Sequence, residues 1–298
     1  MSERPFFSVI IPTHNRAAIL GNAIGSVLDQ TYSDYELIIV NDHSDDNTEE
    51  IVKGFSDPRI KFLMNSRRRG PSGTRNTGIY AASGQWISFL DDDDIWLTKK
   101  LESLHMKIQD LEKNVGIIYT GFAYYDFDRK EMLQIVMPEK QGYIQDELLY
   151  KNHIGTLSVV SIKRNALKEA GGIDEKMSVG EDFDLYVRIA GKWKVSLIKN
   201  VLTYYRASNA DKISLNSKKR LESYREFLLK HNDLIAKSPR LRHRSASLLF
   251  KSAFMEKNIS QLLRSLPWTL AGICVDLKNF IEILKFSVSR VVRNRAHN

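Results

Sequence analysis

The sequence contains very little cysteine and begins without a segment typical of export. Cys274 is the one cysteine among 298 residues, which excludes an intramolecular disulfide and a zinc site made of several cysteines. The first residues, Met1-Ser2-Glu3-Arg4-Pro5, are polar, unlike those of a signal peptide. These absences favour a protein of the cytoplasm.

The sequence also lacks a long uninterrupted hydrophobic run. Its most apolar late segment, residues 268–292, contains five charged residues, whereas a membrane span needs about 20 apolar residues with few charges. One interpretation is a helix in the membrane interface, with Trp268 and the basic end near anionic headgroups. The other is a helix packed on the preceding domain or on a partner subunit. The basic end consists of Arg290, Arg293 and Arg295.

Charge is distributed unevenly along the chain. The formal net charge is +8, but residues 215–298 hold 17 Lys or Arg against 6 Asp or Glu, a net +11, and the first 214 residues carry −3. A basic tail of this kind is expected to contact an anionic surface. We expect no nucleic acid, because no nucleic-acid-binding motif accompanies the charge, and an anionic membrane surface is the candidate that remains beside packing on protein.

Four consecutive carboxylates stand in Phe89-Leu90-Asp91-Asp92-Asp93-Asp94-Ile95-Trp96. Neighbouring like charges repel, and desolvating them is costly unless a cation is present, for which a divalent metal is the obvious candidate. The alternative is a solvated turn or helix start, although an N-cap needs only one Asp. Residues 85–90 are typical of a buried strand. The carboxylates are therefore expected at a strand's carboxyl end, where open α/β sheets bind ligands.

Short apolar strands alternate with helical segments along the first part of the chain. Residues 8–12 predict a buried strand, and apolar residues recur at helical spacing from Ile19 to Leu28. This alternation predicts an α/β fold with a mainly parallel sheet flanked by helices. Further strands are expected at 36–40, 60–64, 85–90, 115–120, 156–162 and 201–206, and helices after residue 47, around 79–82, and at 97–111, 166–172 and 180–189.

Polar residues follow the predicted strands. Because parallel strands end at one edge of a sheet, Thr13, Asp42 and the aspartate run are expected to meet there. Farther along, Glu181 and Asp182 begin an amphipathic helix, where the helix dipole favours carboxylates.

These motifs together resemble those of family 2 glycosyltransferases. The similarity lies in residues 8–16, 40–48, 75–79, the aspartate run and 180–182, in the family's order, and covers about residues 5–210. The resemblance implies the Rossmann-like GT-A fold. It also implies an inverting transfer of sugar from a nucleotide-diphosphate donor, a UDP-sugar, to an acceptor hydroxyl.

The resemblance further implies roles for individual residues. Pro12, Thr13, His14, Asn15 and Asp42 would bind the donor's base and ribose, with Arg75 nearby, and Asp91 or Asp92 would face the ribose or the metal's water shell. Asp93 and Asp91 match the outer residues of the family's Asp-x-Asp motif and would bind Mn²⁺ or Mg²⁺. Asp182 matches the catalytic base, with Glu181 or Asp184 as alternatives.

The chemistry of the transfer needs such groups. A departing nucleoside diphosphate develops negative charge, which a bound divalent cation neutralises, and an acceptor hydroxyl is a poor nucleophile until a base removes its proton. The sequence departs from the family pattern after residue 206. Many family members carry a histidine there that reaches the metal or the diphosphate, whereas Ala207-Ser208-Asn209-Ala210 follows here. A third protein ligand is therefore in question, and Arg206 or Ser214 would cover the diphosphate instead.

Some polar residues also have purely structural interpretations. Asp42 could form an Asx-type turn, and Arg75 a surface ion pair. We expect Arg67-Arg68-Arg69 to form a solvated basic loop, with contact to donor phosphate or acceptor as the alternative. Asp94 is expected to begin the next helix, and Trp96 to pack beneath the aspartate run.

We therefore expect a catalytic domain at 1–214, with a nucleotide-sugar half at about 1–96 and an acceptor half at about 97–214, and a helical basic region at 215–298. The expected function is a metal-dependent glycosyltransferase of bacterial surface polysaccharide or glycolipid synthesis. It would act on a saccharide or lipid-linked acceptor, peripherally on the inner membrane face. A sugar nucleotidyltransferase is the enzyme alternative, although residues 12–16 lack the glycines of that class. A non-catalytic sugar- or membrane-binding relative is the other.

Overall fold

The computed structural model describes residues 4–177, 179–207, 223, 226–242 and 245. The chain forms two compact units, Met1–Lys212 and Ile213–Asn298. Helix α9 (Asn232–Ile235) belongs to the second unit, and the apolar segment 268–292 lies outside the described residues. Among the residues described, no helix combines the length and apolar character that crossing a bilayer requires.

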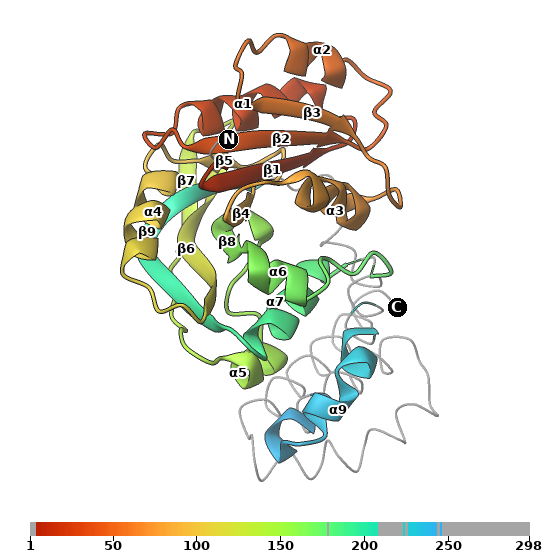
Figure 1. Ribbon diagram of the computed structural model, residues 1–298, viewed down its shortest axis with the longest axis vertical. Helices are drawn as coiled ribbons and strands as arrows, with labels where there is room; N and C mark the ends of the chain where they lie inside the picture. The colour runs from red at the N-terminus through yellow and green to blue at the C-terminus, as the bar shows by residue number, and fades with distance from the viewer. Residues whose placement is uncertain (1–3, 178, 208–222, 224–225, 243–244, 246–298) are drawn as a thin grey trace, which may run out of the picture. The chain divides into compact units, whose positions relative to one another are not determined.

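The first unit alternates strands and helices as the hydrophobic pattern predicts (Figure 1). Its strands are β1 (Phe7–Thr13), β2 (Tyr35–Asn41), β3 (Ile60–Met64), β4 (Trp86–Phe89), β5 (Ile95–Trp96), β6 (Val115–Asp126), β7 (Glu131–Val136), β8 (Val160–Lys163) and β9 (Lys194–Arg206). Its helices are α1 (Ala17–Leu28), α2 (Thr48–Lys53), α3 (Pro71–Ala81), α4 (Lys100–Gln109), α5 (Gln145–Tyr150), the 3₁₀ turn η1 (Leu157–Val159), α6 (Arg164–Glu169) and α7 (Glu181–Ala190).

The strands form one nine-stranded sheet in the order β3-β2-β1-β4-β8-β6-β9-β5, with β7 paired to β6. The amino-terminal strands are parallel to one another, as expected. The second half is mixed, because β8 runs antiparallel to both β4 and β6 while β6 and β9 are parallel. The expected α/β sheet with flanking helices is confirmed, and its parallel part is the half that carries the first two loops of the site.

Strand β1 is buried on both faces, which explains its uninterrupted apolar sequence. Val9 and Ile11 share a hydrophobic core with Leu20 and Ile24 of α1. The alternate residue, Ile10, faces α3, where a Cβ on Gly78 would come within 2.6 Å of its side chain. Since successive side chains of a strand point to opposite faces, α1 and α3 cover opposite sides of β1.

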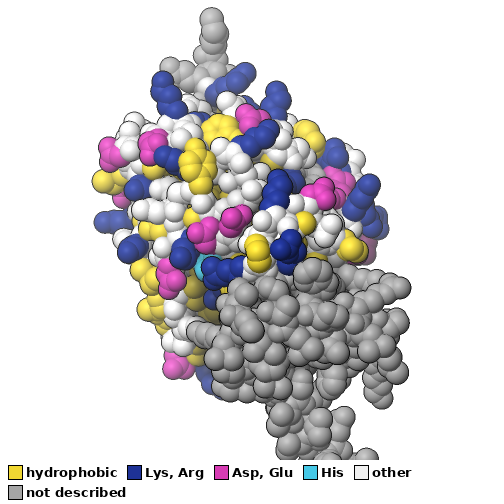
Figure 2. Space-filling model, turned by 90° about the horizontal axis from the view of Figure 1, so that it is seen from below, with side chains coloured by type: hydrophobic (Ala, Val, Ile, Leu, Met, Phe, Trp, Pro, Cys, Tyr) yellow, Lys and Arg dark blue, Asp and Glu magenta, His cyan; other side chains and the backbone are white. Residues whose placement is uncertain are grey.

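Several predicted boundaries shift where tertiary contacts intervene. The predicted helix 97–111 is shortened to α4, because the Leu97 amide donates to Leu202 of β9 at 3.1 Å. The predicted strand 156–162 begins instead with η1. Figure 2 shows basic and acidic side chains interspersed on the visible face of the described residues, with neither sign confined to one area.

Glu36 is a buried carboxylate on β2 that joins three other segments. Its Oε1 accepts hydrogen bonds from the Ser8 hydroxyl at 2.5 Å and from the Ser83 amide at 2.6 Å. Its Oε2 lies 2.6 Å from the Lys61 ammonium. Burial by itself raises the pKa of Glu36, but these hydrogen bonds outweigh it and lower the pKa to about 2.

Glu36→Gln is expected to lower the free energy of unfolding by about 2–3 kcal/mol at pH 7. Because the folded pKa lies below the unfolded value of 4.5, this stabilisation is present above pH 4.5 and is lost as the pH falls towards 2. Urea unfolding at pH 7 and pH 3 measures it, with the exposed Glu49→Gln as control. An equal loss in Glu36→Gln at both pH values would contradict the assignment.

Candidate active site

The loops after β1 and β2 are hydrogen-bonded to each other. The His14 Nδ1 donates to the Asp42 backbone oxygen at 2.8 Å. The Asn15 amide donates to the Ser44 hydroxyl at 2.9 Å, and the Asn15 side-chain oxygen accepts from the Asp45 amide at 2.7 Å. The structure thus brings together Thr13, His14, Asn15 and Asp42 at the carboxyl edge of the parallel strands, where the sequence places them. Pro12 precedes them within β1, in register with Val40.

The Asp42 carboxylate is buried and held at both oxygens. Its Oδ1 accepts from the Asn65 side chain at 2.6 Å and its Oδ2 from the Gly70 amide at 2.7 Å. These two donors fix the carboxylate's orientation more firmly than an Asx turn would. Sequence reasoning missed Asn65, although it follows β3 as directly as Asp42 follows β2, and the rule that polar residues follow strands would have found it.

The aspartate run leaves β4 at the same edge of the sheet. The Asp91 amide donates a hydrogen bond to the Ser158 hydroxyl at 3.0 Å. The Asp91 carboxylate lies 2.6 Å from Arg75 at Oδ1 and 3.4 Å from the Thr156 hydroxyl at Oδ2. Segments from the two halves of the sheet therefore hold the first aspartate of the run.

Arg75 lies buried on α3 between two carboxylates. One guanidinium nitrogen is 2.6 Å from Asp91, and another is 3.0 Å from Glu181 at the start of α7. Burial disfavours the charged form, but the two carboxylates outweigh it and hold the pKa of Arg75 above its usual range. The surface ion pair envisaged as its structural alternative is instead a buried bridge, and its contact with a donor stays a prediction.

Asp182 is the second residue of α7, and Gly180 is the N-cap residue that precedes the helix. Gly180 has φ +78°, a conformation that L side chains rarely adopt. Burial raises the pKa of Asp182 to about 7, and the charges of Glu181 and Asp91 act in the same direction. A carboxyl group that titrates near neutrality is suited to general-base catalysis. The opposing groups are the Phe183 amide, which donates to its Oδ1 at 2.7 Å, and Arg75.

Asp93 and Asp92 lie next to cationic side chains. The Asp93 carboxylate is 3.3 Å from Arg16, and its backbone oxygen accepts from Arg206 at 3.1 Å. Burial raises the pKa of Asp92 to about 6, against the effects of Thr13 and Arg16. Two arginines, Arg16 and Arg206, therefore lie at the third aspartate of the run.

A divalent cation fits this donor set only as a site shared with a substrate. Within the described ranges, no group of three or more His, Cys, Asp or Glu side chains is placed to hold a metal. Mg²⁺, however, is commonly bound by one or two carboxylates together with substrate phosphates. Asp91 and Asp93 provide such carboxylates, with side chains 23% and 19% exposed. The raised pKa of Asp92 is consistent with a place that a cation would stabilise.

Asp94 does not begin the next helix, which corrects the expectation from the sequence. Helix α4 begins at Lys100, whereas Asp94 is fully buried and its Oδ1 accepts from the Arg206 amide at 3.0 Å. Asp94 thus ties the end of the run to the end of β9. Trp96 packs in the core below, as expected, and its indole donates to the Ser158 backbone oxygen at 2.8 Å.

Lys100 is a buried cation that sequence reasoning missed. Its ammonium group donates to the Thr120 hydroxyl at 3.1 Å and to the Thr203 hydroxyl at 3.0 Å. Burial lowers the pKa of Lys100 to about 7, and Asp94 acts against this effect. Asp94 is also fully buried, and its burial raises its pKa well above the usual range. No local pattern distinguishes Lys100 from the exposed lysine before it.

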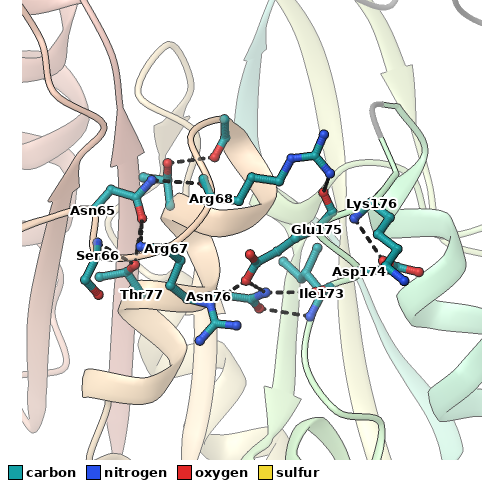
Figure 3. Close-up of polar contacts among 12 residues, drawn as sticks. Asn65, Ser66, Arg67, Arg68, Asn76, Thr77, Ile173, Asp174, Glu175 and Lys176 are labelled. Atoms are coloured by element: carbon teal, nitrogen blue, oxygen red, sulfur yellow. Dashed lines mark hydrogen bonds and ion pairs between the residues drawn. The ribbon is translucent and has the colours of Figure 1, made fainter.

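The basic loop Arg67-Arg68-Arg69 is exposed, as expected, but two of its arginines have partners. Arg67 contacts the Glu175 carboxylate, and Arg68 donates to the Glu175 backbone oxygen at 2.7 Å (Figure 3). A segment of the acceptor half therefore holds these two arginines.

Arg75→Gln is expected to lower the free energy of unfolding by about 3–5 kcal/mol, because it leaves Asp91 and Glu181 facing each other without the buried cation. Urea unfolding at pH 7 measures the loss. The control is Arg129→Gln, which removes an exposed arginine and should leave stability nearly unchanged. Similar small effects in both variants would show that the bridge contributes little.

Comparisons with known proteins identify the family of the chain. The model of the family described as glycosyl transferase family 2 matches residues 8–171. WfgD of Escherichia coli, described as UDP-Glc:alpha-D-GlcNAc-diphosphoundecaprenol beta-1,3-glucosyltransferase, is 39% identical over 153 residues, which are 51% of this chain and 58% of that protein. The GalNAc(5)-diNAcBac-PP-undecaprenol beta-1,3-glucosyltransferase of Campylobacter jejuni is 31% identical over 75% of this chain and 71% of its own.

Solved structures show the same fold. The crystal structure of S. aureus TarS 1-349 in complex with UDP-GlcNAc has a TM-score of 0.64 at 17% identity and covers 93% of this chain and 79% of that one. The mannosyltransferase PcManGT of Pyrobaculum calidifontis, in complex with GDP-Man and Mn²⁺, has a TM-score of 0.57 at 16% identity, covering 98% and 88%. The fold and the family expected from the sequence motifs are confirmed, and the chain belongs to glycosyl transferase family 2.

Proposed function

We propose that this protein transfers a sugar, with inversion, from a UDP-sugar to a hydroxyl group of a lipid-linked saccharide. The observation that carries the proposal is the Arg75 bridge. It joins Asp91, at the end of a donor-side strand, to Glu181 beside Asp182. The segment proposed to bind metal and phosphate and the proposed base, whose pKa is about 7, are thereby held together.

The proposed donor site consists of the loops after β1 and β2. Thr13, His14 and Asn15 line one side of it and Asp42 the other, and their mutual hydrogen bonds preorganise the pair of loops. The name of WfgD includes UDP-Glc, and the TarS structure contains UDP-GlcNAc. These names support a UDP-sugar.

The proposed acceptor is a saccharide carried on a polyprenyl diphosphate. WfgD and the Campylobacter enzyme are both named for undecaprenol-linked substrates. The chain spans about 58% of the length of WfgD, so the acceptor is proposed from the kind of substrate rather than from a shared binding site. A lipid-linked acceptor and the basic residues 215–298 support a peripheral position on the inner membrane face.

In the proposed reaction, Asp182 accepts the proton of the acceptor hydroxyl. The acceptor oxygen forms a bond to the anomeric carbon as the bond from that carbon to the diphosphate oxygen breaks, and UDP leaves. Attack from the face opposite the leaving group inverts the anomeric configuration. Arg75 keeps Asp91 and Glu181 in place and so maintains the separation between the base and the donor segment.

Asp93 and Asp91 would hold Mn²⁺ or Mg²⁺ together with the donor's phosphates. A cation bound there supplies Lewis-acid stabilisation of the departing diphosphate. Asp92 would contact the ribose or the cation's water shell, and Arg206, held at the Asp93 backbone oxygen, would lie towards the diphosphate. The PcManGT structure, which contains GDP-Man and Mn²⁺, supports a divalent cation in this fold.

Asp182→Asn is expected to lower kcat about 10²- to 10⁴-fold with UDP binding unchanged, because the amide cannot accept the proton. In the wild-type enzyme the transfer rate should rise between pH 6 and 8, since a base with a pKa of about 7 is protonated below that value. Radiolabelled sugar transfer measures both effects, with the exposed Asp128→Asn as control. Normal transfer by Asp182→Asn would rule out this base.

Asp93→Asn is expected to abolish the part of UDP-sugar binding that depends on the cation. In wild-type protein, a UDP-sugar with Mn²⁺ at 100 times its dissociation constant should stabilise the fold by about 2.7 kcal/mol. Thermal shifts with and without EDTA measure this, and the exposed Asp110→Asn serves as control. Undiminished transfer by wild-type protein in EDTA would overturn the metal dependence while leaving the family unaffected.

A further inference from the structure

Two segments that are distant in sequence meet beside the proposed donor site (Figure 3). We call residues 65–70, between β3 and α3, the arginine loop. We call residues 172–176, which precede α7 in the chain, the approach segment. The first belongs to the half that carries Asp42, and the second leads to Asp182, so contacts between them join the two sides of the site.

The side-chain amide of Asn76 on α3 forms two hydrogen bonds with the backbone of the approach segment. Its side-chain nitrogen donates to the Ile173 backbone oxygen at 2.8 Å, and its side-chain oxygen accepts from the Ile173 amide at 3.0 Å. A Cβ on Gly172 would lie 2.9 Å from that side-chain oxygen, and Gly172 has φ +76°. A glycine at this position therefore permits the close pairing.

Glu175 accepts hydrogen bonds from three side chains, those of Asn76, Arg67 and Arg68. Its Oε1 accepts from the Asn76 side chain at 2.7 Å and from Arg67, and its backbone oxygen accepts from Arg68 at 2.7 Å. Arg67 is further placed by Tyr80, with its guanidinium 4.8 Å from the ring centroid. The hydrogen bonds and the charge of Arg67 outweigh burial and lower the pKa of Glu175, so it is charged at neutral pH.

Hydrogen bonds within the arginine loop connect Arg67 to Asp42. The Asn65 side-chain oxygen accepts from the Arg67 amide at 3.0 Å and from the Thr77 hydroxyl at 2.8 Å. The Asn65 nitrogen donates to Asp42 at 2.6 Å, and the Gly70 amide, at the other end of the loop, donates to the second Asp42 oxygen at 2.7 Å. An unbroken series of hydrogen bonds thus runs from Glu175 to Asp42.

We propose that Glu175 is a positioning residue that couples the donor side of the site to the acceptor side. Its carboxylate holds Arg67 and its backbone oxygen holds Arg68, and the two arginines keep the arginine loop in the conformation that orients Asp42. Its backbone anchors the segment that leads into Gly180 and Asp182. The inference rests on the proposed function for the roles of Asp42 and Asp182, whereas the coupling itself is a property of the fold.

The coupling is tested without any ligand by hydrogen exchange on Glu175→Gln. We expect the Arg67 and Gly70 amides, which donate to Asn65 and Asp42, to exchange about five-fold faster than in wild-type protein. Glu112→Gln is the matched control, because it neutralises a more exposed ion pair with Lys194 in the same unit. Faster exchange confined to residues 173–176, with the arginine loop unchanged, would overturn the proposal.

A double-mutant cycle with UDP and Mn²⁺ separates coupling from general loss of stability. Glu175→Gln and Arg67→Gln should each weaken UDP binding about five-fold, and the double variant should weaken it no further. Losses that multiply in the double variant, or unchanged binding in Glu175→Gln, would contradict the proposal. If wild-type protein bound no UDP, the proposed function would fail while hydrogen exchange still decided the coupling.

Discussion

The buried Arg75 guanidinium is the interaction on which the rest of the site depends. It neutralises two carboxylates, Asp91 after β4 and Glu181 at the start of α7, that would otherwise repel each other. Removing a buried charge from water is costly unless partners compensate it. The two short ion pairs compensate that cost here. The bridge therefore joins α3 to the start of α7 and to the first aspartate of the run, where the sugar transfer is proposed to take place.

Three carboxyl groups of this unit differ in how many hydrogen-bond donors and cations surround them. Glu36 is supplied with enough donors to remain charged, and its pKa lies at about 2. Asp92 and Asp182 are undersupplied, and their pKa values lie at about 6 and 7. Glu36 links β2 to neighbouring strands, whereas Asp92 and Asp182 lie where a cation or a proton is proposed to bind. Perturbed carboxyl groups at the edge of a sheet are a physical marker of a functional site.

Much of the fold follows from patterns within short stretches of sequence. Strand β1 and helix α1 lie where apolar runs and helical spacing predict them. Predictions were wrong where a distant partner changed the local outcome. Asp94 has the composition of a helix start, but Arg206, 112 positions away, holds its carboxylate below the surface. Arg67 and Arg68 are exposed as predicted, but their partner Glu175, more than 100 positions away, could not be read from the local sequence.

The sequence by itself determined the family, the order of strands and loops along the chain, and the edge of the sheet at which the loop residues and the aspartate run meet. Those features depend on local periodicity and on the rule that parallel strands end together. Only the tertiary structure decided which cation compensates which carboxylate, that Lys100 is buried, and that Asp182 titrates near neutrality. Burial and ion pairing depend on residues far apart in the chain, for example Arg75 and Glu181 at 106 positions, and no short motif records such a distance.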